Sequence, residues 1–417
     1  MERESNWPYW GQFICLGLGM VVYTICRSGF PVGLAAMGKE FQWTAFEVGV
    51  LSTIFLLGQA LIDIPAGFWV DRLDRKRLIF VGLFGIGFFT AMVTLANNFW
   101  SALIYRVLFG ILEGVYNIAQ FAVAGSILPN NRALVNGLTQ IFYGLGNYGG
   151  QGLVGHLLRS HPGYWQLPLL WLGGISMAYA VLSLFLFQRR YLRRYETQNE
   201  MARYGFWTTL GLTIRNPNVW KAIAIHASNT IPNWAVLGLG NYLFIHYRHY
   251  DPVFSATVFG LGWGIGGLFV PFGTYWADRI GRRPVVCSFG LWTAVMVFLL
   301  FYVAPPTWIM VVLSACVAFG INGLYTLGYT ITQDAVASAS LSGIGIATGF
   351  AGGFGYLFAM LAGPMVGALI PAIGPLWAMN VVVIGGEILV VIFGFFFLKE
   401  DLRPGRKLPL AAEAAAE

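Results

Sequence analysis

Long apolar runs separated by short polar segments dominate the chain. A helix needs about 20 apolar residues to cross the roughly 30 Å hydrocarbon core of a bilayer. By this measure the pattern predicts twelve membrane-spanning helices, at residues 11–34, 46–69, 78–97, 100–127, 134–157, 166–188, 218–245, 254–276, 284–304, 307–331, 342–370 and 375–398. Most links between the runs are short, as expected when each span is a self-satisfied helix. The link at residues 189–217 is long, polar and arginine-rich.

The long link divides the runs into two sets of six. We therefore expect an all-α membrane protein with 12 transmembrane helices in two six-helix pseudo-symmetric bundles. The expected boundaries are an N-terminal six-helix bundle at residues 1–190, a cytoplasmic linker at 191–217, a C-terminal six-helix bundle at 218–400 and a cytoplasmic tail at 401–417.

Composition agrees with a membrane protein. Of the 417 residues, 57% are hydrophobic and 10% are charged, whereas soluble domains carry about a quarter charged residues. The four cysteines are scattered and form no CxxC pair, which argues against a disulfide framework or a zinc site. No nucleophile–base pair, P-loop or metal-ligand cluster is evident in the sequence. We expect no enzymatic activity, no metal and no cofactor, with a proton as the coupling ion.

The net charge of +7 comes from 25 basic and 18 acidic residues, and the positions of the basic residues carry a topology signal. Lys and Arg are enriched in cytoplasmic loops of membrane proteins. If the N-terminus lies inside, twenty basic residues fall in inner segments and three, namely Lys39, Arg159 and Arg248, fall in outer loops. This predicts an integral plasma (inner) membrane protein with both termini cytoplasmic. Because the basic residues are explained by topology, we do not expect nucleic acid as a partner. The expected partners are membrane lipids and a small anionic substrate, and the protein is expected to function as a monomer.

One short sequence occurs twice, about 207 residues apart. Gly67 to Lys76 follows the second predicted span, and Gly273 to Arg283 follows the eighth. An Asp at a helix end beside a basic turn can pair with neighbouring helix ends and hold the inner face closed. Asp63, two turns before Asp71, is interpreted as part of this gate and not as a proton site. The predicted cytoplasmic gate comprises Asp63, Gly67, Asp71, Arg72, Asp278, Arg279 and Arg282, with Asp334 in an equivalent position in the second half.

The repeated sequence resembles the signature of the major facilitator superfamily, G-x-x-x-D-R-x-G-R-R/K. The first copy has Asp74 where the signature has Gly, and the second has Thr274 where it begins with Gly. The resemblance implies two six-helix bundles, a cavity between them within the membrane, and rocking around a central site.

Ionisable residues within predicted spans are candidates for function, because a charge in the membrane is costly. Arg27 lies in the first span. Arg106, Glu113, Asn117 and Gln120 form one polar stripe on the fourth, at spacings of seven, four and three. We expect both arginines to bind an anion in a common cavity and Glu113 to couple it to a proton. Protonated Glu113 would free the guanidinium groups to hold a carboxylate or phosphate.

The segment from Arg106 to Gly114, together with Arg27, resembles the anion:cation symporter family of sugar-acid transporters. The resemblance implies that Arg27 contacts the anion and that Glu113 takes part in proton coupling. In that family an Asp often precedes the first arginine, and here the residue is Cys26. A second proton site of that kind is therefore missing.

Other polar residues recur at helical spacing within the spans. They are expected to hydrogen-bond a hydroxylated substrate, although such residues also join helices to one another. The candidates are Tyr23, Gln140, Tyr143, Asn147, Asn229, Asn233, Asn322 and Tyr325.

These features predict a secondary active transporter that moves a small organic anion, a carboxylate or an organic phosphate, by alternating access with proton symport. One alternative is a drug/proton antiporter, although such exporters usually carry a Gly-Pro pair in the fifth helix and residues 144–150 lack proline. Another is a facilitative carrier of an uncharged solute, with Arg27 paired internally. Glu387, near the middle of the last span, has no assigned role.

Overall fold

The computed structural model describes residues 7–43, 47, 50–51, 53–127, 132–161, 164–188, 192, 206–250, 252–303, 305–338 and 344–398. Nearly all of these residues are helical, and no strand occurs among them. The first half contains α1 (Trp7–Glu40), α3 (Phe55–Arg72), α4 (Arg75–Met92), α5 (Phe99–Ile127), α6 (Arg132–Ser160) and α7 (Gln166–Leu186). The second contains α9 (Pro217–His246), α10 (Pro252–Ile280), α11 (Arg282–Phe298), α12 (Trp308–Ser338), α13 (Ile344–Ala359), α14 (Ala362–Ile373) and α15 (Pro375–Phe397).

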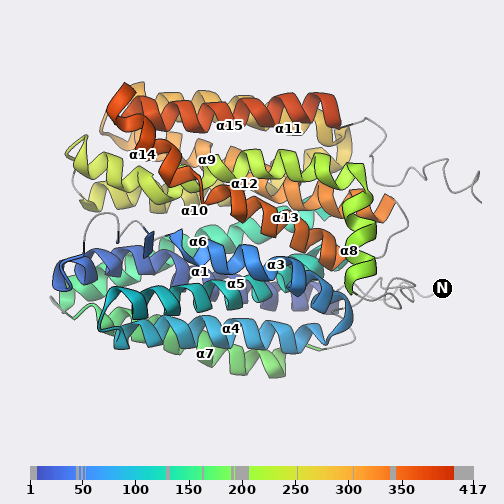
Figure 1. Ribbon diagram of the computed structural model, residues 1–417, viewed down its shortest axis with the longest axis horizontal. Helices are drawn as coiled ribbons and strands as arrows, with labels where there is room; N and C mark the ends of the chain where they lie inside the picture. Colours follow the sequence, from blue (N-terminus) through green and yellow to red (C-terminus); the bar gives the residue numbers. More distant parts are fainter. Residues whose placement is uncertain are drawn as a thin grey trace, which may run out of the picture.

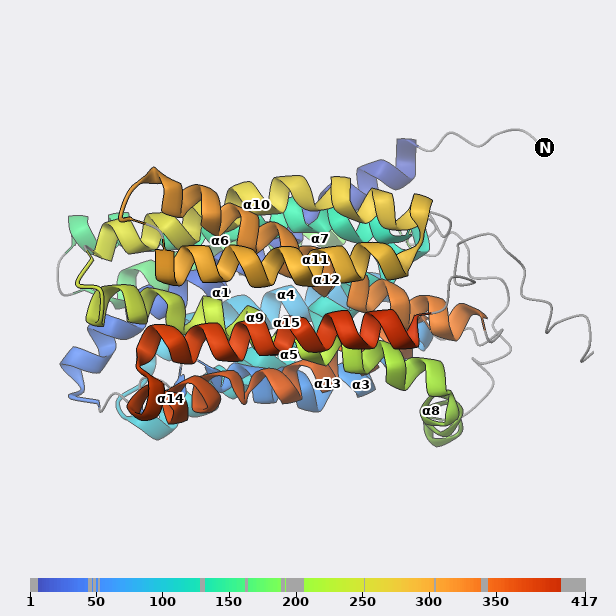
Figure 2. The same ribbon diagram turned by 90° about the horizontal axis from the view of Figure 1, so that it is seen from above.

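The helices run roughly parallel to one long axis (Figures 1 and 2). In Figure 1, α1 to α7 form one group and α9 to α15 the other. A short helix, α8 (Phe206–Arg215), lies across one end of the molecule within the predicted linker. Helix α1 begins at this end and α15 ends at it. We call this end the α8 side.

The described helices follow the predicted spans in order, with one difference. The eleventh span was predicted as one helix over 342–370, and this is wrong, because a turn at Met360 and Leu361 separates α13 from α14. Pro364 explains the break. It has no backbone N–H to donate to the carbonyl of Met360, so one helical hydrogen bond is missing at this turn.

Glycines permit the closest helix crossings. A Cβ on Gly110 of α5 would overlap the carbonyl of Phe55 on α3, and a Cβ on Gly58 would overlap the carbonyl of Val107. The same device joins the two halves, because a Cβ on Gly267 of α10 would lie 2.6 Å from the carbonyl oxygen of Gln140 on α6. Small residues let helix backbones approach in this way within membranes.

Eight of the described helices are long and apolar enough to cross a membrane by length and composition alone. They include α1, α5, α10 and α12. Two long helices, α6 and α9, are not among the eight. Both supply polar side chains to the centre of the molecule, which lowers their mean hydropathy.

Candidate transport site

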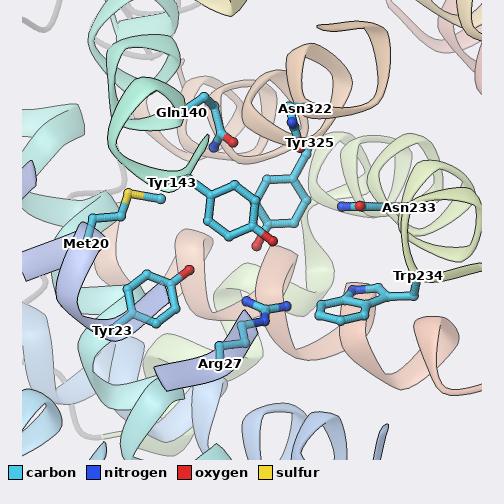
Figure 3. Close-up of a pocket in the computed structure, with 9 residues that line it drawn as sticks. All are labelled: Met20, Tyr23, Arg27, Gln140, Tyr143, Asn233, Trp234, Asn322 and Tyr325. Carbon is cyan, nitrogen blue, oxygen red and sulfur yellow. The ribbon is translucent and has the colours of Figure 1, made fainter. Parts of the chain in front are cut away.

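A cavity lies between the two halves at the centre of the bundle (Figure 3). Its walls come from four helices, two in each half: α1, α6, α9 and α12. The lining residues are Met20, Tyr23, Arg27, Gln140, Tyr143, Asn233, Trp234, Asn322 and Tyr325. Among the described residues that line the cavity, Arg27 is the only charged one.

Arg27 forms a buried ion pair with Glu113. Its Nη1 donates to Glu113 Oε1 at 2.9 Å, joining α1 to α5. The Glu113 side chain is fully buried, and the Arg27 side chain is 8% exposed. Glu113 Oε2 has no hydrogen-bond partner among the described residues. The carboxylate therefore neutralises the one cation that reaches the cavity.

Aromatic rings surround the Arg27 guanidinium. Its Cζ lies 4.2 Å from the ring centroid of Trp234, which belongs to the other half of the protein. Phe55 and Tyr143 contribute further ring faces at 5.2 and 5.9 Å. Cations are attracted to such faces, most strongly to that of Trp. The contact with Trp234 thus connects the two halves at the ion pair.

Three amides face the cavity with unused hydrogen-bonding atoms. Both polar atoms of Gln140, Oδ1 of Asn233 and Nδ2 of Asn322 lack partners among the described residues. In Figure 3, Tyr143 and Tyr325 lie between Arg27 and the two amides Gln140 and Asn322. Buried polar groups are normally hydrogen-bonded. These atoms are therefore available to a bound solute.

Arg106 was predicted to share this cavity with Arg27, and it does not line it. Its guanidinium is enclosed by Phe30, Phe55 and Phe109, with ring centroids 3.9, 4.8 and 4.6 Å from Cζ. Arg106 is 2% exposed. Helical spacing correctly placed Arg106 and Glu113 on one face of α5, but it could not show that Phe55 would cover the arginine.

Asn147 and Asn229 also lie outside the cavity lining. Asn147 donates to the carbonyl of Tyr143 in its own helix at 3.1 Å. Asn229 donates to the carbonyl of Ile321 on α12, also at 3.1 Å. The Asn229 amide therefore joins two helices, which is the alternative that spacing alone left open, whereas the Asn147 amide bonds within its own helix.

The remaining polar residues of α5 lead away from the cavity toward the α8 side. Asn117 donates to the hydroxyl of Tyr356 on α13 at 3.0 Å. The Tyr356 hydroxyl also bonds that of Tyr325, which in turn bonds Tyr329. This chain of hydroxyls carries hydrogen bonding from the cavity wall into the interface between the halves.

Several of the predicted gate residues meet on the α8 side. Arg282 donates to Asp278 at 2.6 Å and to Asp334 at 3.0 Å. Asp278 also accepts the backbone N–H of Leu134 at 2.9 Å, which ties α10 to α6 in the other half. Asn136, two residues further along α6, donates to Thr330 on α12 at 3.0 Å. The bonds of Asp278 and Asn136 cross between the halves and hold them together on this side, whereas Arg282 bonds residues of its own half and positions Asp278.

The first copy of the repeat uses different partners. Arg75, which corresponds to Arg282, is buried and donates to the carbonyls of Val70 and Leu192. Asp74 caps α4 by accepting the N–H of Lys76, whereas the corresponding Gly281 begins α11 with a φ of 106°.

The other predicted gate residues have these positions. Arg72 stacks on Phe68, and Arg279 lies over Tyr275, so neither reaches across the halves through these contacts. Gly67 is buried within α3, and the Asp71 side chain lies outside the described residues.

Some residues of the site were not among the predicted ones. Met20 lines the cavity and lies three and seven residues before Tyr23 and Arg27, so helical spacing could have identified it. Trp234 is a neighbour of Asn233 in sequence, but its contact with Arg27 depends on how the halves pack. No sequence pattern indicates that contact.

The Major Facilitator Superfamily profile matches residues 16–270 and 265–416, which together span nearly the whole chain. The chain belongs to the major facilitator superfamily. The crystal structure of the fucose:proton symporter of E. coli is similar over 94% of this chain and 99% of that one, with a TM-score of 0.71 and 15% identity. The family match and the structural similarity confirm the predicted twelve-helix fold of our protein.

Of three similar proteins, two are named for transport and one for drug resistance. The chain is 28% identical over 135 residues to "Probable anion transporter 6, chloroplastic" of Arabidopsis thaliana, covering 30% of this chain and 26% of that protein. It is 26% identical to a "Putative metabolite transport protein" of Haemophilus influenzae, covering 84% and 88% of the two chains. It is 23% identical to "Quinolone resistance protein NorA" of Staphylococcus aureus, covering 77% and 79%.

The alignment with the plant anion transporter thus spans about a quarter of that relative's length. Membership of the superfamily and the apolar helices make this an integral membrane transporter of small molecules and not an enzyme.

Proposed function

We propose that this superfamily member carries a small organic anion across the membrane together with a proton, and that Arg27 and Glu113 form the coupling pair. The observation that supports the proposal is the buried 2.9 Å ion pair beside the cavity. Removing one member of a buried pair leaves an uncompensated charge, which costs about 3–5 kcal/mol. An anionic substrate and a proton on Glu113 can replace the pair together, because each satisfies one of the separated partners.

The sequence of events follows from this exchange. A substrate carboxylate or phosphate binds the Arg27 guanidinium, for which its planar fork of donors is suited. A proton on Glu113 removes the charge that competes for the same guanidinium. The amides of Gln140, Asn233 and Asn322 hydrogen-bond the rest of the substrate, and Trp234 closes against Arg27 from the other half.

The proposed orientation places the α8 side in the cytoplasm. The predicted inner loops and tails hold twenty basic residues against three in the outer loops, and loops rich in Lys and Arg remain inside. The state in the structure is then closed toward the cytoplasm by the bonds of Asp278 and Asn136 between the halves. We assign the protein to a plasma (inner) membrane, with both termini cytoplasmic and one chain as the transport unit.

Drug efflux is the second candidate, and the relation to the quinolone resistance protein favours it. Two features oppose it. The cavity lining holds a cation and no carboxylate, so a cationic drug would face Arg27 directly. In addition, α6 contains no proline in any of its 29 residues.

The test is uptake by the purified protein in liposomes, with a panel of sugar acids, other carboxylates and organic phosphates. Concentrative uptake driven by an inward proton gradient, lost in Arg27→Ala, is the expected result. Glu113→Gln should retain counterflow exchange of the same anion and lose gradient-driven accumulation. Expulsion of a cationic dye under the opposite gradient, with no anion moving, would replace the proposal with drug efflux.

A further inference from the structure

Asp63 is a second buried carboxyl group, separate from the Arg27–Glu113 pair. It lies on α3 at the contact with α13, in the interface between the two halves, and is 0% exposed. Neither of its oxygens has a hydrogen-bond partner among the described residues. It was expected to be part of the cytoplasmic gate and not a proton site, and its carboxyl group forms no ion pair within the described part of the chain.

Glycines of both halves enclose this carboxyl group. A Cβ on Gly114 of α5 would lie 2.6 Å from Asp63 Oδ1, and a Cβ on Gly352 of α13 would overlap Oδ2. Gly349, one turn before Gly352, lies against the carbonyl of Asp63. The side chain therefore fills a space bounded by two helices of its own half and one of the other, and closing this interface removes it from water.

Among the described residues, no cation acts electrostatically on Asp63. On α5 its charged neighbour is Glu113. On α12 and α13 the neighbours that can titrate are Tyr329 and Tyr356. On its own helix, Gln59 precedes it by one turn and is neutral. An isolated ionised carboxylate is far more costly to bury than a neutral carboxylic acid, so the closed interface favours the acid form.

We propose that Asp63 is a second proton-binding site, which must be protonated for α3 to close against α13. When the interface opens, water reaches the carboxyl group, and it ionises by releasing its proton to that water. Reclosure requires a proton to return to the same oxygen atoms. The site goes beyond the Arg27–Glu113 exchange, since it senses the conformation of the halves and touches no substrate.

The experiment follows the conformational equilibrium directly and needs no substrate. Spin labels at Arg77→Cys and Ser288→Cys, exposed positions near the start of α4 and in α11, report the separation of the halves. The native cysteines are replaced by alanine, and distances are measured by pulsed electron paramagnetic resonance from pH 5 to pH 9. In the otherwise unaltered protein, the ratio of closed to open molecules should fall as pH rises. One titrating proton changes this ratio by up to about tenfold per pH unit.

The Asp63→Asn variant should show the same spin-label distance in the closed state. Its ratio of closed to open molecules should change less than about twofold over the same pH range. A response in Asp63→Asn equal to that of the parent would overturn the inference, as would a parent protein that does not respond to pH. If Asp63→Asn does not fold, Asp63→Ser replaces it, because a smaller neutral side chain fits between Gly114 and Gly352. Glu113→Gln is the control and should keep the response. Loss of the response in Glu113→Gln alone would assign the pH effect to the coupling pair and reject Asp63.

Discussion

Arg27 of α1 and Glu113 of α5 meet at 2.9 Å beside the central cavity, although 86 residues separate them in the chain. The pair explains how a single cavity can respond to both a proton and an anion. It also has consequences for stability that need no transport assay.

We expect the two members of the pair to be coupled in stability. Arg27→Met should lower the free energy of unfolding by about 3–5 kcal/mol, because Glu113 then remains buried without its partner. The double variant Arg27→Met/Glu113→Gln should recover most of this loss. Unfolding of the detergent-solubilised protein, followed by intrinsic fluorescence, provides the measurement. Losses that simply add in the double variant would show that the two side chains do not depend on each other.

The two amides Asn322 and Asn229 offer a matched comparison. Asn322 presents an unpartnered Nδ2 at the cavity, whereas Asn229 donates to the carbonyl of Ile321. Asn322→Ala should weaken substrate binding about fivefold, the effect of losing a hydrogen bond worth about 1 kcal/mol, with little change in melting temperature. Asn229→Ala should lower the melting temperature and leave affinity nearly unchanged. Reversed effects would place the substrate elsewhere.

Arg282 should control opening on the α8 side through Asp278, which it bonds and which accepts the N–H of Leu134 from the other half. Thr330→Cys, placed in a protein without native cysteines, introduces a thiol at a fully buried position. Arg282→Gln removes the bonds to Asp278 and Asp334, so a polar maleimide should label this thiol at least about tenfold faster, the equivalent of 1.4 kcal/mol. Arg283→Gln serves as the control, since Arg283 stacks on Phe395 at 4.1 Å. Equal labelling rates in the two variants would remove Arg282 from the closing contacts.

Close packing of α3 on α5 should make Gly110 sensitive to a single methyl group. Gly110→Ala places a Cβ on the backbone carbonyl of Phe55, which cannot rotate away, and should destabilise the protein by about 1–3 kcal/mol. Gly152→Ala in α6 meets nothing within 4 Å and should be neutral or stabilising by up to about 1 kcal/mol. Thermal unfolding of the two variants side by side is the check. A neutral Gly110→Ala would mean that the crossing is looser than the structure shows.

The sequence by itself determined the membrane architecture, because each span satisfies its own backbone and only needs enough apolar residues to cross a bilayer. The sequence also contained the repeated turn, which indicated the superfamily, and the spacing that gave the helical face of Glu113. The break at Pro364 was also encoded locally, in its missing N–H, although span length concealed it. Packing between helices distant in the chain decided the rest.

Tertiary structure alone placed Phe55 over Arg106, paired Glu113 with Arg27, and enclosed Asp63 between glycines of both halves. Helical spacing gives the face on which a side chain lies, but it does not give the helix that this face meets or the groups that line the contact. Whether a buried charge is paired, covered or isolated depends on those groups. The chemistry of this transporter was therefore decided by contacts between segments about 50 to 300 residues apart, which no local pattern records.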